Sequence, residues 1–159
     1  MRITGIRGFT HYDLYNRQVL QRGHLERLSY DELRSLFDGY DITHVVGLAR
    51  KENMILRQLD DEQFSWYHYY PIPDNKLPKA TADDLMTIAH DIAVDLQGKE
   101  AVLSYCNAGR NRSGLMNALI LRELLSLTGK EALEMVRRER PRAIANEHFE
   151  AFLLGLDRV

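Results

Sequence analysis

Apolar and polar positions along the chain follow two different periods. Short runs rich in β-branched or aromatic residues, the pattern of strands, occupy residues 2–6, 42–48, 64–70 and 101–105. Longer stretches with apolar positions at helical spacing occupy residues 29–37, 82–97, 115–125, 131–140 and 147–156. Because the two kinds of segment alternate, the pattern predicts an α/β fold with a central, mostly parallel β-sheet of four to five strands flanked by helices.

Local sequence signals predict the helix ends. Three small polar residues are each followed three positions later by an acidic one, the pattern of a helix N-terminus: Ser29 with Glu32, Thr81 with Asp84, and Thr128 with Glu131. Asn146 is expected to cap the last helix. Gly98 and Pro141 predict two helix ends, and the helix that follows residues 101–105 is expected to stop near Gly129.

Residues 71–78 form a proline-rich segment that contains Pro71, Pro73 and Pro78. Proline has a fixed φ and no backbone N–H, so this segment is expected to be a loop rather than a helix or an interior strand. Stiff ends at Pro73 and Pro78 with a freer middle suit a lid that closes over a site.

Composition narrows the class of protein. The 159 residues carry a formal net charge of −2, which gives no basic field for nucleic acid or acidic membranes. Length and hydrophobic content suit one globular domain over residues 1–159. One cysteine cannot form an intramolecular disulfide, the amino terminus lacks the apolar core of a secretory signal, and no apolar run approaches the roughly 20 residues needed to span a bilayer. We therefore expect a soluble, cytoplasmic monomer with no membrane partner.

The single cysteine, Cys106, begins the motif "CNAGRNRS", which runs from a predicted strand into a predicted helix. Free backbone N–H groups at a helix N-terminus, together with the helix dipole, favour an anion. A curled loop would surround a phosphoryl group with the amides of Asn107, Ala108, Gly109, Arg110, Asn111 and Arg112. Arg112 would grip two oxygens with its planar fork, and the same field would favour the thiolate of Cys106 beneath the phosphorus.

A structural role is the alternative for each of these residues taken alone. A lone cysteine is most often a small buried hydrophobe, and an arginine at a helix start is most often solvated. The C-x5-R spacing, the glycine between the two residues and the strand-to-helix context together favour a nucleophile, Cys106, and a phosphate clamp, Arg112. Ser113 is placed to donate a hydrogen bond to the sulfur when water displaces the phosphoryl group.

The segment "CNAGRNRSG" resembles the signature of the cysteine-dependent protein tyrosine phosphatases, and the chain is most similar to the compact dual-specificity group. The resemblance covers residues 42–154 and includes "ITHVVGL", "YYPIPDNKLP" and "VRRERPRAIANEHFEAFL". It implies the phosphatase fold, Cys106 as nucleophile, Arg112 as phosphate clamp, Ser113 as thiolate partner and Asp74 as mobile general acid, with no cofactor. A turn residue in a proline-bounded loop is the alternative for Asp74.

Two positions depart from the pattern that the resemblance implies. Tyr105 stands where the family usually has a histidine, which braces the loop and helps to set the state of the thiol. Asn111, immediately before the signature arginine, is also familiar from phosphatases that act on the 5′ triphosphate of RNA.

Three functions compete for this site. The leading hypothesis is a phosphatase for phosphorylated proteins, acting on phosphotyrosine and also on phosphoserine or phosphothreonine. An RNA 5′-phosphatase or an inositol phosphatase is supported by Arg110 and Asn111. However, Asp74 counts against RNA, whose relatives commonly lack an acid, and the loop has no lysine of the kind common in inositol-directed relatives. A non-catalytic phospho-binding module would generally lose Cys106 or Arg112, and both are present.

Residues around the mouth of the site carry weaker predictions. Aromatic side chains in the segment 7–18 are candidates to flank a phosphotyrosyl ring, with packing against the domain as the alternative: Phe9, Tyr12 and Tyr15. Cations from several segments are candidates for a positive rim, with scattered solvated charge as the alternative: Lys76, Lys79, Arg110, Arg140 and Arg142.

No metal or nucleotide is expected. The six histidines show neither an H-x-x-x-H pair nor a partner cysteine, so each is expected to be solvated or in the core: His11, His24, His44, His68, His90 and His148. The segment "TGKE" lacks the glycine-rich run of a nucleotide-binding loop, so neither ATP nor a dinucleotide is expected.

Overall fold

A computed structural model describes residues 9–14, 17–23, 29–50, 66–96, 100–107 and 110–159, with the backbone alone described before residue 29 and at Trp66. The predicted strand at 2–6 and the predicted helix end at Gly98 lie outside the described residues.

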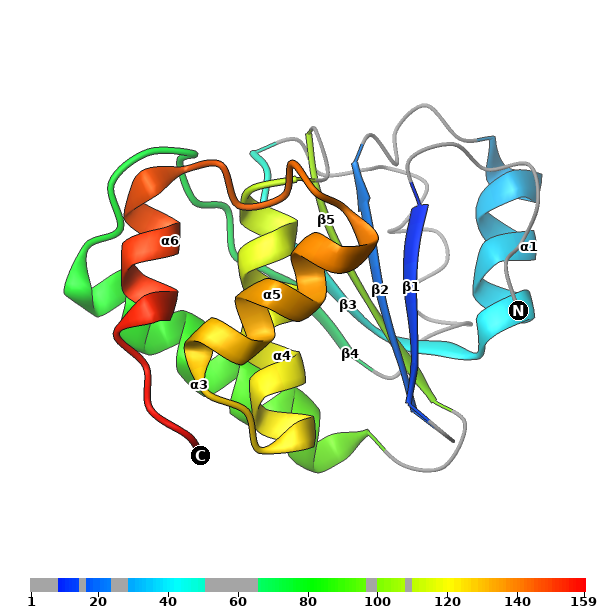
Figure 1. Cartoon of the computed structure of the whole chain (residues 1–159). Helices are drawn as coiled ribbons and strands as arrows, with labels where there is room; N and C mark the ends of the chain where they lie inside the picture. Colours follow the sequence, from blue (N-terminus) through cyan, green and yellow to red (C-terminus); the bar gives the residue numbers. More distant parts are fainter. Residues whose placement is uncertain (1–8, 15–16, 24–28, 51–65, 97–99, 108–109) are drawn as a thin grey trace.

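The described strands form one sheet (Figure 1). Its five members are β1 (Phe9–Leu14), β2 (Arg17–Gly23), β3 (Ile42–Gly47), β4 (Trp66–Tyr69) and β5 (Ala101–Cys106), in the spatial order β1-β2-β5-β3-β4. β1 pairs with β2 in antiparallel register, and every other pairing is parallel. The predicted mostly parallel sheet of four to five strands is therefore confirmed.

Helices cover both faces of the sheet (Figure 1). They are α1 (Tyr30–Tyr40), α3 (Lys79–Asp95), α4 (Arg112–Leu125), α5 (Gly129–Glu139) and α6 (Glu147–Leu154). α1 packs with Ile42 and Val45 of β3 and with alternate residues of β5 in one apolar cluster, and α3 to α6 pack with Val46 and the other face of β5 in a second. β5 and most of β3 are thus buried on both sides, as central strands of a parallel sheet require.

Three predicted helix caps are confirmed. Ser29 and Glu32 form a complete capping box at α1. Thr128 Oγ1 accepts from the backbone N–H of Glu131 (3.1 Å) at α5. At α6, Asn146 Oδ1 accepts from the backbone N–H groups of residues 148 and 149.

Two predicted helix boundaries are wrong. α3 begins at Lys79 rather than after Thr81, because Pro78 with φ −59° already sets the chain for the first turn and needs no side-chain cap. α4 ends at Leu125 rather than near Gly129, because Ser126 turns into the left-handed region with φ 53°. Gly129 instead begins α5, where a Cβ would lie 1.7 Å from the carbonyl oxygen of residue 153.

The segment predicted as an aromatic rim is part of an edge hairpin. Residues 9–14 and 17–23 form β1 and β2, and β2 runs parallel to β5 beside it. The side chains of Phe9 and Tyr12 and the whole of Tyr15 lie outside the described part of the chain, so the rim stays a prediction. No helix within the described residues is long and apolar enough to cross a membrane.

Candidate active site

The carboxyl ends of three parallel strands and the amino end of a helix meet at one edge of the sheet (Figure 1). Backbone pairing continues past the strands: Leu48 N donates to Tyr105 O (3.0 Å), and Ile72 N donates to Leu48 O (3.1 Å). β5 ends at Cys106 and α4 begins at Arg112. In the sheet, β4 lies on one side of β3 and β5 lies on the other, so the strand order reverses at β3. Open α/β sheets bind ligands at the carboxyl ends of the strands beside such a reversal.

Cys106 lies at this edge with its side chain 3% exposed, within the larger apolar cluster. Its Sγ is 3.3 Å from Oγ of Ser113, with the thiol as donor. Ser113 is fully buried in the first turn of α4. When the sulfur is ionised, the hydroxyl can turn and donate to it. The structure therefore brings the predicted nucleophile and its predicted partner together, with little exposure to bulk solvent.

The guanidinium of Arg112 is fastened to the two loops that leave β3 and β4. Nη1 donates to the carbonyl oxygens of Ile72 (3.1 Å) and Leu48 (3.5 Å). Nε is buried and has no hydrogen-bond partner among the residues that the structure describes. A buried unpartnered donor costs roughly 1–3 kcal/mol, so it is rare unless a ligand accepts from it. One nitrogen is thus anchored while another is left for an oxyanion.

The loop 71–78 is anchored where it leaves β4. Tyr70 Oη donates to Asp84 Oδ2 of α3 (2.6 Å), and this hydrogen bond, with a smaller contribution from burial, raises the pKa of Tyr70 above its ordinary value. Ile72 is buried, and its carbonyl oxygen accepts from Arg112. These contacts fix the path of the chain just before Asp74, which is exposed.

Two side-chain amides from distant segments hold the carboxylate of Asp74. Asn111 Nδ2 donates to Oδ2 (2.9 Å), and Asn146 Nδ2 donates to Oδ1 (2.8 Å). Asn111 immediately precedes α4, and Asn146 caps α6. The structure therefore places the predicted acid against the end of the phosphate-loop segment.

The remaining residues of the predicted phosphate loop are only partly described. Asn107 and Arg110 are exposed, and the carbonyl oxygen of Arg110 accepts from Ile144 N (3.2 Å). Ala108 and Gly109 lie outside the described residues. Enclosure of an anion by this loop stays a prediction.

The five cations predicted for the mouth of the site do not share one environment. Four are exposed and one is half-buried: Lys76, Lys79, Arg110 and Arg142, and the half-buried Arg140. Lys79 pairs with Asp83 within α3 (3.1 Å). The loop that carries Arg140 and Arg142 contacts the phosphate-loop segment through Ile144 and Arg110, and the loop that carries Lys76 contacts it through Asp74 and Asn111.

Tyr105 lies on the opposite face of β5 from Cys106, in the cluster under α1. Its hydroxyl is 2.9 Å from the hydroxyl of Tyr67 on β4. Gly47 at the end of β3 makes room for the ring, because a Cβ there would lie 2.5 Å from Tyr105 Oη and 2.8 Å from Cζ. The side chain of Tyr105 therefore packs on the face of β5 opposite to Cys106.

Gly47→Ala is expected to lower the free energy of unfolding by roughly 1–3 kcal/mol, because the added methyl group overlaps a fully packed ring. Chemical denaturation monitored by circular dichroism measures the effect. Gly155→Ala is the matched control, because its Cβ meets nothing closer than 3.6 Å. Equal stability of the two variants would show that the Tyr105 ring moves aside without cost.

The described histidines are dispersed over four elements. His44 is buried in β3 and His68 is half-buried in β4, and burial lowers the pKa of each. His90 lies 3.2 Å from Glu123 on the surface, and His148 is exposed at the start of α6. Among the residues whose side chains are described, no three His, Cys, Asp or Glu are grouped to hold a metal ion.

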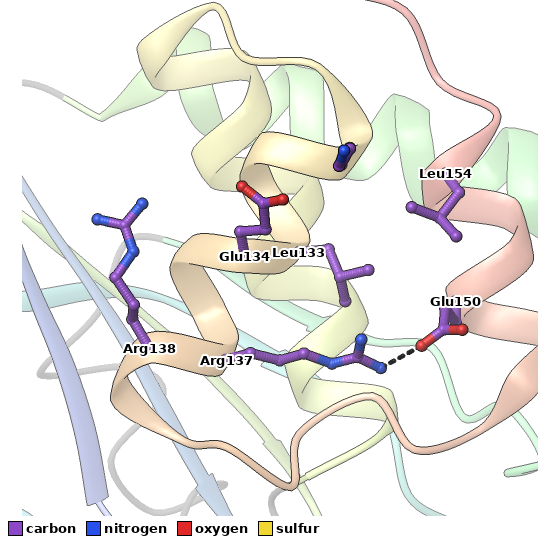
Figure 2. Close-up of a pocket in the computed structure, with 7 residues that line it drawn as sticks. Leu133, Glu134, Arg137, Arg138, Glu150 and Leu154 are labelled. Atoms are coloured by element: carbon purple, nitrogen blue, oxygen red, sulfur yellow. Dashed lines mark hydrogen bonds and ion pairs between the residues drawn. The ribbon is translucent and has the colours of Figure 1, made fainter.

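A separate hollow of about 580 Å³ lies between α5 and α6 (Figure 2). Leu133 and Leu154 line it, and an ion pair between Arg137 and Glu150 spans one side. None of the predicted site residues lines this hollow, so it is distinct from the candidate active site.

Solved structures that share this arrangement are protein tyrosine phosphatases and dual-specificity phosphatases, so the chain has the protein tyrosine phosphatase fold. Tk-PTP in its active form is 23% identical over 89% of this chain and 91% of that chain, with a TM-score of 0.70. Human DUSP28 is 21% identical over 90% and 88%, with a TM-score of 0.63. The PTP-2 phosphatase of Cydia pomonella is 21% identical over 86% and 84%, with a TM-score of 0.67.

Comparisons of sequence gave no match. No protein-family model matches the chain, and none of the curated proteins matches it. The similarity of the chain to known proteins is therefore a similarity of fold.

Proposed function

We propose that the protein is a phosphatase that hydrolyses phosphate monoesters on proteins through a cysteinyl-phosphate intermediate. The observation that carries the proposal is the hydrogen bonding of Arg112: Nη1 donates to two carbonyl oxygens, while the buried Nε has no partner within the described part of the chain. A guanidinium with an anchored end and a free donor fits phosphate oxygens. Cys106 and Ser113 lie at the same strand end and helix start.

The proposed reaction has two steps. The Cys106 thiolate attacks phosphorus, the bond from phosphorus to the ester oxygen breaks, and Asp74 delivers its proton to the departing oxygen. A water molecule then attacks the phosphocysteine and gives a proton to the Asp74 carboxylate. The bond between sulfur and phosphorus breaks, and the returning thiolate accepts a hydrogen bond from Ser113. The enzyme ends in its starting protonation state and needs no cofactor.

Asp74 supports an ester substrate with a poor leaving group. Serine, threonine and tyrosine side chains leave as basic oxygens, so a nearby acid accelerates their release. Asn111 is, with Arg110, one of the two residues that support the RNA or inositol phosphatase alternative, and its side chain is engaged with Asp74 and with the backbone of residues 145 and 146. We therefore place phosphoproteins ahead of RNA 5′ ends and inositol phosphates as substrates.

A substrate panel tests this proposal directly. Phosphotyrosine and phosphoserine peptides, 5′-triphosphorylated RNA and inositol phosphates would be assayed for phosphate release in the presence of a metal chelator. We expect turnover of the peptides, with the highest kcat/KM for phosphotyrosine. Preference for RNA or inositol phosphates would refute phosphoproteins as the substrate class and would leave the cysteinyl-phosphate mechanism in place. Binding of phosphopeptides without any release of phosphate would instead indicate a non-catalytic module.

Asp74→Ala is expected to lower kcat by about 10²-fold or more on phosphoserine peptide, because the leaving oxygen then departs without a proton. On p-nitrophenyl phosphate, whose leaving group is stable as an anion, the loss should stay below about tenfold. Steady-state kinetics on both substrates measures the ratio. An equal loss on both substrates would assign the acid role to another group.

A further inference from the structure

Asp74 is an acid that packing does not hold in place. Its side chain is exposed in a loop without regular secondary structure. Beside it lies an open hollow of about 330 Å³ that is also lined by Asn75, Glu147 and His148. A carboxyl group with such free space explores several rotamers unless hydrogen bonds fix it. The position of Asp74 therefore depends on the two amides that donate to it.

The side chain of Asn111 does not cap α4, although the residue stands at the N-cap position of that helix. Asparagine immediately before a helix commonly accepts from the first backbone N–H groups of that helix, but Asn111 makes no such cap at α4. Those N–H groups are consequently left for an anion. Instead, Oδ1 accepts from Ala145 N (2.8 Å) and Asn146 N (3.3 Å), which orients Nδ2 toward Asp74.

We propose that Asn111 is a positioning residue that sets the general acid Asp74 relative to the bound phosphoryl group. This inference rests on the proposed function, in which Asp74 protonates the departing oxygen. The backbone of Asn111 belongs to the phosphate loop and its amide holds Oδ2 of Asp74 at 2.9 Å. One residue thus links the acid to the site of the reacting phosphorus, and two backbone donors of the loop 145–146 hold its amide in orientation.

Asn146 contributes the second hydrogen bond but is a poorer residue to test. Its Oδ1 caps α6, and its Nδ2 also donates to the carbonyl oxygen of Asn75 (3.1 Å). Removing it would disturb a helix and a loop together with the acid. Asn111 makes no cap for its own helix, so its removal acts more selectively on Asp74.

Asn111→Ala is expected to lower kcat on phosphoserine peptide by roughly 10- to 10²-fold, because a displaced acid no longer meets the leaving oxygen. On p-nitrophenyl phosphate the loss should be only about twofold, since that substrate needs little protonation. The constant for competitive inhibition by inorganic phosphate should not change, which shows that the phosphate loop is intact. A loss of equal size on both substrates would show that Asn111 only braces the loop and would overturn the inference.

Asn75→Ala is the matched control, because it removes an amide from the same loop while its carbonyl contact with Asn146 is kept. It should preserve the wild-type ratio of the two activities. If Asn111→Ala does not fold, as judged by circular dichroism, Asn111→Ser replaces it, since the shorter hydroxyl cannot span Asp74 and the loop 145–146 together.

A double variant separates this inference from the proposed function. In the Asp74→Ala background, Asn111→Ala should cost less than about twofold more on phosphoserine peptide, because residues that act as a unit are not additive. If the loss of the double variant equalled the product of the two single losses, the positioning role of Asn111 would be refuted, while Asp74 would remain the acid. If Asp74→Ala itself showed no selective loss on the peptide, the acid assignment would fail and the inference with it.

Discussion

Cys106→Ser is expected to lower kcat on p-nitrophenyl phosphate by about 10⁴-fold or more, because a serine hydroxyl is not ionised at neutral pH and cannot replace the thiolate as nucleophile. The substitution exchanges one sulfur atom for oxygen in a side chain that is 3% exposed, so the fold should persist. Phosphate release over hours, with a chelator present, measures the residual rate. Binding of inorganic phosphate by calorimetry should remain, since the arginine is untouched.

Ser104→Ala is the matched control for this change on the same strand. Ser104 is fully buried, and no described residue makes a hydrogen bond to its Oγ. Removing that hydroxyl should leave activity unchanged and stability equal or higher, because an unpartnered buried polar atom is lost. Activity retained in Cys106→Ser would refute the cysteinyl-phosphate mechanism.

Arg112→Ala is expected to lower kcat by roughly 10³- to 10⁵-fold, the size of effect typical of an arginine that stabilises a phosphoryl-transfer transition state. Arg112→Lys should recover little of this loss. Lysine keeps the charge but cannot bond Ile72 O and Leu48 O with one nitrogen while offering another to the phosphate. Initial rates on p-nitrophenyl phosphate, and inhibition by inorganic phosphate, measure the two variants.

Arg158→Ala is the control for loss of positive charge. Arg158 donates to the carbonyl oxygen of Ser126, the residue immediately after α4, so it lies at the opposite end of the helix from Arg112. It should keep wild-type kinetics. A rate for Arg112→Lys within a few-fold of wild type would show that positive charge is sufficient. It would refute the claim that the anchored guanidinium is needed.

The sequence predicted best those features that depend on neighbours along the chain. The caps Ser29, Thr128 and Asn146 could be predicted because each bonds the backbone within three residues of itself, so the pattern lies within a short stretch of sequence. The sequence also predicts a strand at 101–105 and a helix over 115–125 from their different periods, and the structure extends the strand to Cys106 and starts the helix at Arg112. The prediction failed at Thr81, where a proline three residues earlier had already started the helix.

Features that depend on distant segments were missed. Asn111 meets Asp74 across 37 residues, and Asn146 meets it across 72, so no local pattern signals either contact. The interpretation of Asn111 as an RNA-related feature considered only its place beside Arg112. Similarly, nothing in the sequence alone shows that Arg112 Nη1 donates to two carbonyl oxygens while none of the described residues accepts a hydrogen bond from Nε.

Successive side chains of β5 lie on opposite faces of the sheet, so adjacent residues of this strand have different surroundings. Tyr105 belongs to the cluster under α1, whereas the adjacent Cys106 belongs to the cluster under α3 and α4. A lineage could therefore exchange residue 105, with compensation at Gly47 or Tyr67, without altering which molecules fit beside the sulfur. Changes that alter stability at residue 105 and changes that alter the surroundings of Cys106 therefore fall on opposite faces of the same sheet.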